Sequence, residues 1–440
     1  MRAFLQLLTP FVIALGLGAC ELPSAAPAAP KASSNARAGD TEQARASAGG
    51  WVRTPARSIA ADPAVDAMPA TGEAVPAHGS RSMSGLTRPR VVPDPPFTRT
   101  EVARFDQPWA MVFLPDGHLL VTEKSGRMKL LDPASRAVGE VRGVPAVAFG
   151  GQGGLGDVVA HPQFAGNGLV YFSYAEAGAN STRGAAVARA RLQRDASGNG
   201  ATLADMQVVW RQLPKVSGDG HFGHRIAFDA AGKLWITSGD RQKLTPAQDM
   251  ASALGKLLRL NADGSTPADN PFVAQGGSAG QVWSLGHRNP LGIAFDAQGR
   301  LWVHEMGPAG GDELNLIARG ANYGWPLVSE GNHYDGEVIP RHSTRPDIAP
   351  PKAWWSPVIA PAGFIIYSGA MFPDFRGDGF IGGLASQALI RVEFDGTSAR
   401  EAKRYPMGRR IREVEQGPDG AIWVLEDGVD ARVLKLTRNF

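Results

Sequence analysis

The chain has 440 residues, of which 43% are hydrophobic, so it can bury a large core. Its formal net charge is only +3, and no cluster of lysine and arginine is interleaved with aromatic residues, so nucleic acid is not an expected partner. The single cysteine, Cys20, excludes a disulfide within the chain and a set of thiolate metal ligands.

Residues 1–20 predict a lipoprotein signal peptide. An apolar run from Leu5 to Leu17 follows a basic start, and it is too short for a transmembrane helix but typical of an export signal. The run ends in Leu-Gly-Ala-Cys, which is similar to the cleavage box of bacterial lipoproteins; an ordinary signal with an incidental cysteine is the alternative. We predict lipidation of Cys20 and a membrane anchor on the periplasmic side. Glu21 slightly favours the outer membrane, because an aspartate there commonly retains lipoproteins at the inner one.

Residues 21–95 predict a disordered tether. They are rich in Ala, Pro, Ser and Arg and contain one aromatic residue, Trp51. Such a segment cannot bury enough apolar surface to offset the entropy lost on ordering. The folded part is therefore expected to span residues 96–440.

One hairpin pattern recurs through this folded part: an apolar strand, a turn with Asp or Gly, and a second apolar strand that often carries Trp. Clear and looser copies together occupy residues 109–121, 158–172, 226–236, 292–303, 364–381 and 414–424. The turns supply the positive φ that a tight hairpin needs. The pattern predicts an all-β fold, a six-bladed β-propeller of four-stranded antiparallel blades. A β-sandwich is the alternative, but repetition of the same hairpin argues against it.

Two loops just before predicted strands carry candidate acid–base and ligand-binding side chains. His221, His224 and Arg225 share the loop 219–225, where a histidine beside an arginine could act as a general base. From the loop alone, a solvated or structural histidine is the better interpretation. Arg288 and Asn289 lie in the next such loop, and their guanidinium and amide suit a planar acidic ligand; loop-fixing hydrogen bonds are the alternative.

Three further segments complete the candidate site. Gln152 lies in the glycine-rich run 150–154 and offers a donor and an acceptor. Carboxylates and exposed carbonyls in the Gly/Pro loop 304–315 suit a hard cation such as calcium. Arg410 and Arg412 are two residues apart on a predicted strand, so both can face an anion with several carboxylates.

Together these motifs resemble, in their order along residues 100–438, the soluble aldose sugar dehydrogenases that use pyrroloquinoline quinone (PQQ), a family that includes soluble glucose dehydrogenase. The resemblance implies an enzyme that oxidises aldoses at C1 to lactones by hydride transfer to PQQ and passes the electrons to an unknown acceptor, a quinone or a dye. It selects His221 rather than His224 as the base, with Arg225 facing the same site. The implied PQQ ligands are Gln152, Arg288, Asn289, Arg410 and Arg412. The implied calcium ligands are Gly307 and Pro308, with Glu313 and Tyr323 at a second, structural calcium site.

The chain departs from this pattern at several positions. Ala385 follows Leu384 where relatives often place a cofactor-binding lysine, and Gly220 precedes His221 where glucose dehydrogenases have Asp. Met306 stands where many relatives have His or Gln, and no cysteine remains to staple a substrate loop, which favours an open pocket with broad aldose specificity. Two other functions stay open: a calcium-dependent propeller hydrolase or lactonase, and a non-catalytic sugar-binding propeller on the cell surface.

Overall fold

The computed structural model describes residues 95–439, and this part of the chain is all-β, as predicted. Its α-helices are a single turn or little more, α1 (Phe164–Asn167) and α2 (Gly277–Gln281). Within these residues, no helix is both long and apolar enough to span a membrane. The predicted signal peptide with Cys20, and the predicted tether up to residue 94, lie outside the described residues.

Four of the sheets in the described part of the chain have four antiparallel strands each. In hydrogen-bonded order, they are β10 (Gly223–Phe228), β11 (Leu234–Ser238), β12 (Lys256–Leu260) and β13 (Val282–Leu285); β14 (Pro290–Phe295), β15 (Leu301–Glu305), β16 (Asp312–Leu316) and β17 (Ala353–Trp355); β18 (Pro361–Ile366), β19 (Gly379–Gly383), β20 (Ala388–Asp395) and β21 (Ser398–Pro406); and β22 (Ile411–Gln416), β23 (Ile422–Glu426), β24 (Ala431–Arg438) and β1 (Phe97–Phe105).

The fifth sheet has eight strands and consists of two antiparallel halves. They are β2 (Pro108–Phe113), β3 (Leu119–Glu123), β4 (Arg127–Leu131) and β5 (Val138–Arg142), then β9 (Ala201–Arg211), β8 (Arg183–Arg194), β7 (Leu169–Ala177) and β6 (Leu155–Ala160). A short parallel pairing of β5 with β9 joins the halves. Gly139 permits this approach, because a Cβ there would lie 1.4 Å from the carbonyl oxygen of Asn199. The sequence predicted separate four-stranded sheets and did not anticipate this join.

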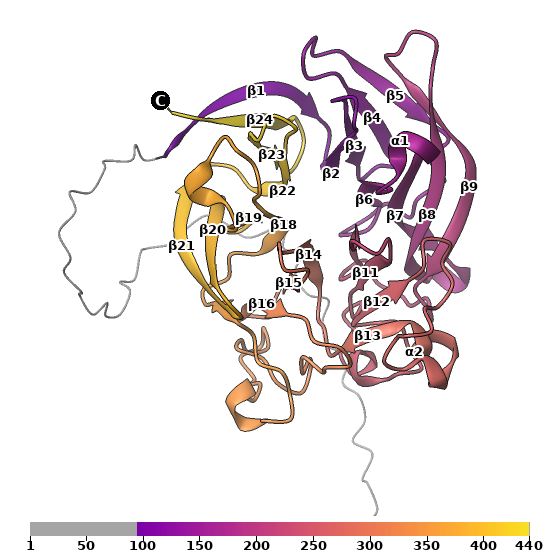
Figure 1. Cartoon of the computed structure of the whole chain (residues 1–440). Coiled ribbons are helices and arrows are strands. Elements are labelled where there is room, and N and C mark those ends of the chain that lie inside the picture. Colours follow the sequence, from indigo (N-terminus) through magenta and orange to yellow (C-terminus); the bar gives the residue numbers. More distant parts are fainter. Residues whose placement is uncertain (1–94, 440) are drawn as a thin grey trace, which may run out of the picture. The chain divides into compact units, whose positions relative to one another are not determined.

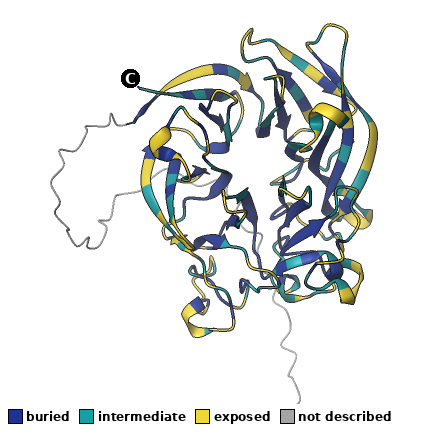
Figure 2. Cartoon of the chain, viewed as in Figure 1, coloured by how far each residue is buried: buried dark blue, intermediate teal, exposed yellow. Residues whose placement is uncertain are grey.

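The first strand of each four-stranded unit lies nearest the centre of the arrangement (Figure 1). These inner strands contact one another in a closed cycle, β2 to β6, β10, β14, β18, β22 and back to β2. The last unit takes its outer strand from the opposite end of the chain, because β1 pairs with β24 from Phe97↔Arg438 to Phe105↔Ala431. Figure 2 shows buried residues concentrated along the inner strands and exposed ones on the outer strands and loops.

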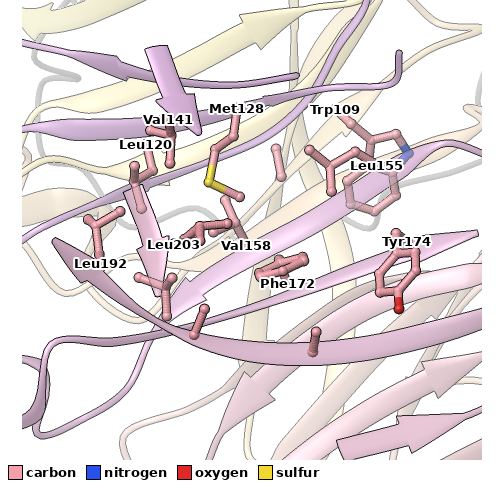
Figure 3. Packing of buried hydrophobic residues seen from close by; sticks show 14 of the residues in the cluster. Trp109, Leu120, Met128, Val141, Leu155, Val158, Phe172, Tyr174, Leu192 and Leu203 are labelled. Carbon is pink, nitrogen blue, oxygen red and sulfur yellow. The ribbon is translucent and has the colours of Figure 1, made fainter. Parts of the chain in front are cut away.

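In two copies of the recurring hairpin, the tryptophan of the second strand donates a hydrogen bond to the aspartate of the turn. Asp229 directly follows β10, and its carboxylate accepts a hydrogen bond from the indole Nε1 of Trp235 on β11 at 2.9 Å. Asp296 and Trp302 repeat the contact between β14 and β15 at 3.0 Å. The indole rings then pack between neighbouring sheets, and similar apolar contacts join β2–β4 to β6–β9 around Met128 (Figure 3).

A buried arginine lies where the inner strands converge. Arg225 on β10 forms ion pairs with Asp157 on β6, at 3.4 Å, and with Glu413 on β22. Its Nε donates to the carbonyl of Leu291 on β14 at 2.7 Å, and its guanidinium lies 4.3 Å from the ring centroid of Trp109 on β2. One side chain therefore contacts four inner strands besides its own.

The carboxylates around Arg225 outnumber it. Burial and the charge of Asp157 raise the pKa of Glu413 to about 7, although Arg225 opposes the shift. Burial, with the charges of Glu413 and Asp157, also raises the pKa of Glu415 well above its usual range. A cavity of about 230 Å³ adjoins these groups inside the ring of inner strands. The native protein thus holds protons here that the unfolded chain would release near pH 4.5.

This predicts a pH-dependent loss of stability that Glu413→Gln removes. Between pH 4.5 and about 7 the native state binds more protons at Glu413 than the unfolded state does, so the parent loses stability relative to the Gln variant as pH rises through this window. We expect a relative change of about 3 kcal/mol across this window. Urea unfolding across the pH range measures it. Glu140→Gln, at an exposed carboxylate on β5, is the control; identical pH profiles for parent and Glu413→Gln would contradict the prediction.

Candidate active site

A pocket opens at the end of the inner strands where β2, β10, β14 and β22 begin. The residues that line it are Trp109, Lys124, Gln152, Phe222, Gly223, His224, Asn289, Leu291, Met306, Leu384, Arg410 and Arg412. They include four of the five predicted PQQ ligands, which come from loops as far apart in sequence as residues 152 and 412. The closed cycle of sheets brings these loops together.

Gln152 connects the glycine-rich loop to the loop of the predicted base. Its backbone N–H donates to the carbonyl of Asp219, and its side-chain Oε1 accepts from the backbone N–H of His221, both at 2.8 Å. His221 is buried and has a left-handed backbone, with φ of 50°. It lies next to the pocket-lining residue Phe222 but is not itself among the residues that line the pocket.

The partner of His221 is Asp240, which the sequence analysis missed. The Nδ1 of His221 lies 2.7 Å from Oδ1 of this buried carboxylate, which also accepts from the indole of Trp325 at 2.7 Å. Burial raises the pKa of Asp240, but His221, Arg288 and Trp325 outweigh it and leave the pKa lowered, so the carboxylate is charged. Asp240 follows β11 directly after Gly239, a position that a strand-end search for carboxylates could have found. Asp219, the acidic residue nearest in sequence, instead pairs with Arg183.

Arg410 and Arg412 are held side by side by a second carboxylate that the sequence analysis missed. Asp427 accepts from the Nε of each arginine at 2.8 Å. Burial opposes ionisation of Asp427, but the two arginines prevail and lower its pKa to about 2. Asp427 thus fixes the two guanidinium groups next to each other at this side of the pocket.

The pocket also contains an amide donor without a partner. Asn289 is buried, and its Oδ1 accepts from the backbone N–H of Gly223 at 3.2 Å. Its Nδ2 has no hydrogen-bond partner among the described residues. A buried donor in this state is costly unless a ligand supplies an acceptor. Together with Arg410 and Arg412, it fits an acidic ligand with carbonyl or carboxylate oxygens.

Lys124 supplies a positive charge that the sequence analysis did not assign. It follows β3, and its Nζ donates to the carbonyl of Gly151 at 2.9 Å, beside Gln152. Leu384 lines the same pocket, whereas the following residue, Ala385, is exposed and does not. The pocket therefore contains a lysine. It follows β3, whereas the lysine of relatives would stand at position 385, after β19.

Arg225, predicted to face the site, does not line the pocket. Its guanidinium lies against the ring of Trp109, which does. Its ion pairs with Asp157 and Glu413 occupy it within the inner strands. Arg225 therefore supports the pocket wall through its contact with Trp109, and its own side chain does not line the pocket.

Arg288 and the predicted metal ligands lie together around a smaller adjacent pocket, which shares Met306 with the first. Gly307, Pro308, Glu313 and Tyr323 line it with Arg288. Arg288 donates to the carbonyl of Met306 at 3.1 Å, and its backbone N–H donates to Glu305 at 2.6 Å. The structure thus separates Arg288 from the other four predicted PQQ ligands by the wall around Met306.

The carboxylates near this second pocket crowd one another. Burial and the charges of Glu305 and Glu330 raise the pKa of Glu313 well above its usual range. Asn315 donates towards both Glu305 and Glu313, and its Oδ1 is buried without a partner among the described residues. Within residues 95–439, no set of three or more acidic, histidine or cysteine side chains is arranged to hold a metal by itself. Backbone carbonyls would have to complete the oxygen shell of a hard cation here.

Known proteins are similar to this chain over most of the residues that the structure describes. Residues 105–435 match the family described as Glucose / Sorbosone dehydrogenase. Aldose sugar dehydrogenase YliI from Escherichia coli (strain K12) is 38% identical over 340 residues, which are 76% of this chain and 91% of the relative. A crystal structure of glucose dehydrogenase has a TM-score of 0.74 at 39% identity and covers 78% of this chain and 100% of its own. The PQQ-bound aldose sugar dehydrogenase from Streptomyces coelicolor has a TM-score of 0.62 at 27% identity, with 78% and 98% covered. The resemblance drawn from the loop motifs is confirmed: the chain belongs to the Glucose / Sorbosone dehydrogenase family.

Proposed function

We propose that the protein is a sugar dehydrogenase that oxidises aldoses at C1 to lactones with PQQ bound in the main pocket. The observation that carries the proposal is the pocket itself, in which Arg410, Arg412 and the unpartnered amide of Asn289 converge. The PQQ-bound relative from Streptomyces coelicolor supports the same cofactor. We also count the eight-stranded sheet as two blades, which makes the domain a six-bladed propeller.

The pocket residues suit a planar quinone that carries three carboxylates. Arg410, Arg412 and Lys124 would bind its carboxylates, while Gln152 and Asn289 would bind carbonyl oxygens. Arg288 would reach the same ligand only across the wall formed by Met306. When bound, PQQ supplies the acceptor for the hydride that leaves C1 of the sugar.

His221 would take the proton of the sugar hydroxyl. The charged Asp240 accepts a hydrogen bond from Nδ1–H, which leaves the lone pair on Nε2 and fixes the orientation of the ring. Asp240 then stabilises the imidazolium that forms when Nε2 takes the proton. The carboxylate is held in turn by Trp325 and backbone amides.

A calcium ion beside the second pocket is the other part of the proposal. The crowded carboxylates Glu305 and Glu313 and the unpartnered oxygen of Asn315 fit a hard cation, as do the carbonyls of Gly307 and Pro308. Calcium bound near the quinone would draw electron density from a carbonyl and favour its reduction. We further propose that the enzyme is exported and anchored through Cys20; its electron acceptor is a separate partner.

The two other functions fit the pocket less well. A metal-dependent hydrolase or lactonase activates water at a metal and has no use for the paired arginines that Asp427 holds in place. A sugar-binding propeller without catalysis would leave the pair of His221 with the buried Asp240 without a purpose. Neither alternative is supported by a specific contact.

Cofactor binding provides the first test. Titration of the calcium-loaded protein with PQQ, followed by absorbance, should reach one equivalent. Arg410→Ala should weaken binding by roughly 1.5–3 kcal/mol, the scale of a charge-assisted hydrogen bond. Arg409→Ala, at an exposed neighbour that does not line the pocket, is the matched control and should bind like the parent. Absence of stoichiometric binding to the parent would refute the proposed function.

Calcium removal provides the second test. Exhaustive chelation should lower the melting temperature and abolish aldose oxidation, and added calcium should restore both, because a ligand bound only to the native state stabilises it. Glu313→Gln should reduce the response of the melting temperature to calcium. A parent whose melting curve and activity are the same after chelation would exclude the calcium site.

The acid–base pair provides the third test. His221→Ala should lower the rate of PQQ reduction by an aldose about 10²- to 10⁴-fold while PQQ still binds. Asp240→Asn should lower the rate at least about tenfold, because the imidazolium that forms on proton transfer loses its counter-charge. Asp219→Asn, at the exposed partner of Arg183, is the control. Single-turnover kinetics distinguish the three; a slowed Asp219→Asn beside a normal Asp240→Asn would overturn the pairing.

A further inference from the structure

His224 on β10 occupies a backbone conformation that few residues other than glycine adopt. Its φ is 75°, in the left-handed region, although it is buried and carries a full side chain. Such strain persists only where the surroundings enforce it, and it concentrates at functional sites. The pairing of β10 with β11 shifts register between Gly223 and Ile226, and such a bulge next to an active site commonly re-aims a side chain.

The ring of His224 lies in a slot built for it. It stacks on Phe222 at 5.3 Å and meets Trp109 edge-on at 5.7 Å, measured between ring centroids. The slot exists because position 156 is a glycine: a Cβ there would lie 2.7 Å from the Cγ of His224. Packing thus holds the imidazole at the wall of the main pocket, which it lines with Asn289.

The ring nitrogens of His224 have no hydrogen-bond partners in the described part of the chain, neither Nδ1 nor Nε2. Burial, with the positive charges of Arg241, Arg225 and Lys124, lowers the pKa of His224 to about 3. The imidazole is therefore neutral near pH 7 and offers one N–H donor and one acceptor nitrogen. Burial of these two nitrogens without hydrogen bonds is unfavourable in free energy, and hydrogen bonds to a bound ligand would reduce this penalty.

His304 on β15 shows which of these features matters. It is equally buried, its two ring nitrogens also lack partners among residues 95–439, and burial lowers its pKa to about 3 as well. However, it packs against Phe364 over Gly292, outside the lining of the main pocket, and its φ is not positive. Unpartnered nitrogens alone do not indicate a ligand; their combination with the pocket wall and the strained backbone distinguishes His224.

We propose that His224 contacts the cofactor and donates its imidazole N–H to an oxygen of bound PQQ, next to the amide of Asn289. This inference rests on the proposed function and adds a ligand that neither the loop motifs nor the choice of His221 as base assigned. The base remains His221, because burial and the nearby positive charges lower the pKa of His224 and make it a poor proton acceptor. His224 acts on affinity for the cofactor, not on removal of the sugar proton.

Two substitutions at position 224 test the contact. His224→Phe keeps an aromatic ring between Phe222 and Trp109 but removes the donor, so the dissociation constant for PQQ should rise about 10- to 100-fold. The cofactor-free variant should melt at or above the temperature of the parent, because two unpartnered buried nitrogens are gone. His224→Asn keeps an N–H donor, and asparagine tolerates a left-handed backbone, so it should bind PQQ within about threefold of the parent.

His304→Phe is the matched control and should bind PQQ like the parent. Absorbance titration of each calcium-loaded protein with PQQ measures the dissociation constants, and thermal melting of the cofactor-free proteins checks their folding. Parent-like affinity of His224→Phe, or equal weakening by His304→Phe, would overturn the role of His224. A parent that binds no PQQ would instead refute the proposed function, and the contact with it.

Discussion

The guanidinium of Arg225 is the interaction on which the centre of the molecule depends. It links β10 to Asp157 on β6, Leu291 on β14, Glu413 on β22 and Trp109 on β2. The remaining inner strand, β18, contributes a glycine, Gly363, where a Cβ would lie 2.2 Å from the Glu413 carboxylate. A buried charge is tolerated only when it is paired and hydrogen-bonded, so each sheet must be in place before this arginine is satisfied. The sheets are thereby held in one relative arrangement.

The pocket depends on this arrangement because no single loop builds it. Trp109 and Leu291 touch Arg225 on one side and line the pocket on the other. The polar groups are then fixed by carboxylates outside the lining: Asp240 orients His221, and Asp427 orients Arg410 together with Arg412. His221, Arg410 and Arg412 thus each have a buried anionic partner that limits the rotation of the side chain.

The features that could be predicted from sequence are local ones. The Asp–Trp hairpins repeat within a dozen residues, so the all-β fold and most strands follow from the pattern. The spacing of Arg410 and Arg412 likewise lets both line one pocket, although only Arg412 lies within β22 and Arg410 precedes it. The partners Asp240 and Asp427 and the contribution of Lys124 could not be inferred in the same way. They reach their places through the packing of whole sheets, and nothing in the adjacent sequence fixes which loop faces which. The join of β5 to β9 depends on one glycine for the same reason.

The pairing of β1 with β24 ties the first described strand to the last. The ribosome produces β1 more than 300 residues before its partner, since Phe97 pairs with Arg438. During synthesis β1 has a free edge, and closure of so long a loop is slow compared with pairing inside one hairpin. The final unit can therefore be completed only after β24 has emerged from the ribosome. If the protein crosses a membrane unfolded, β1 and β24 must both reach the same compartment before they can pair.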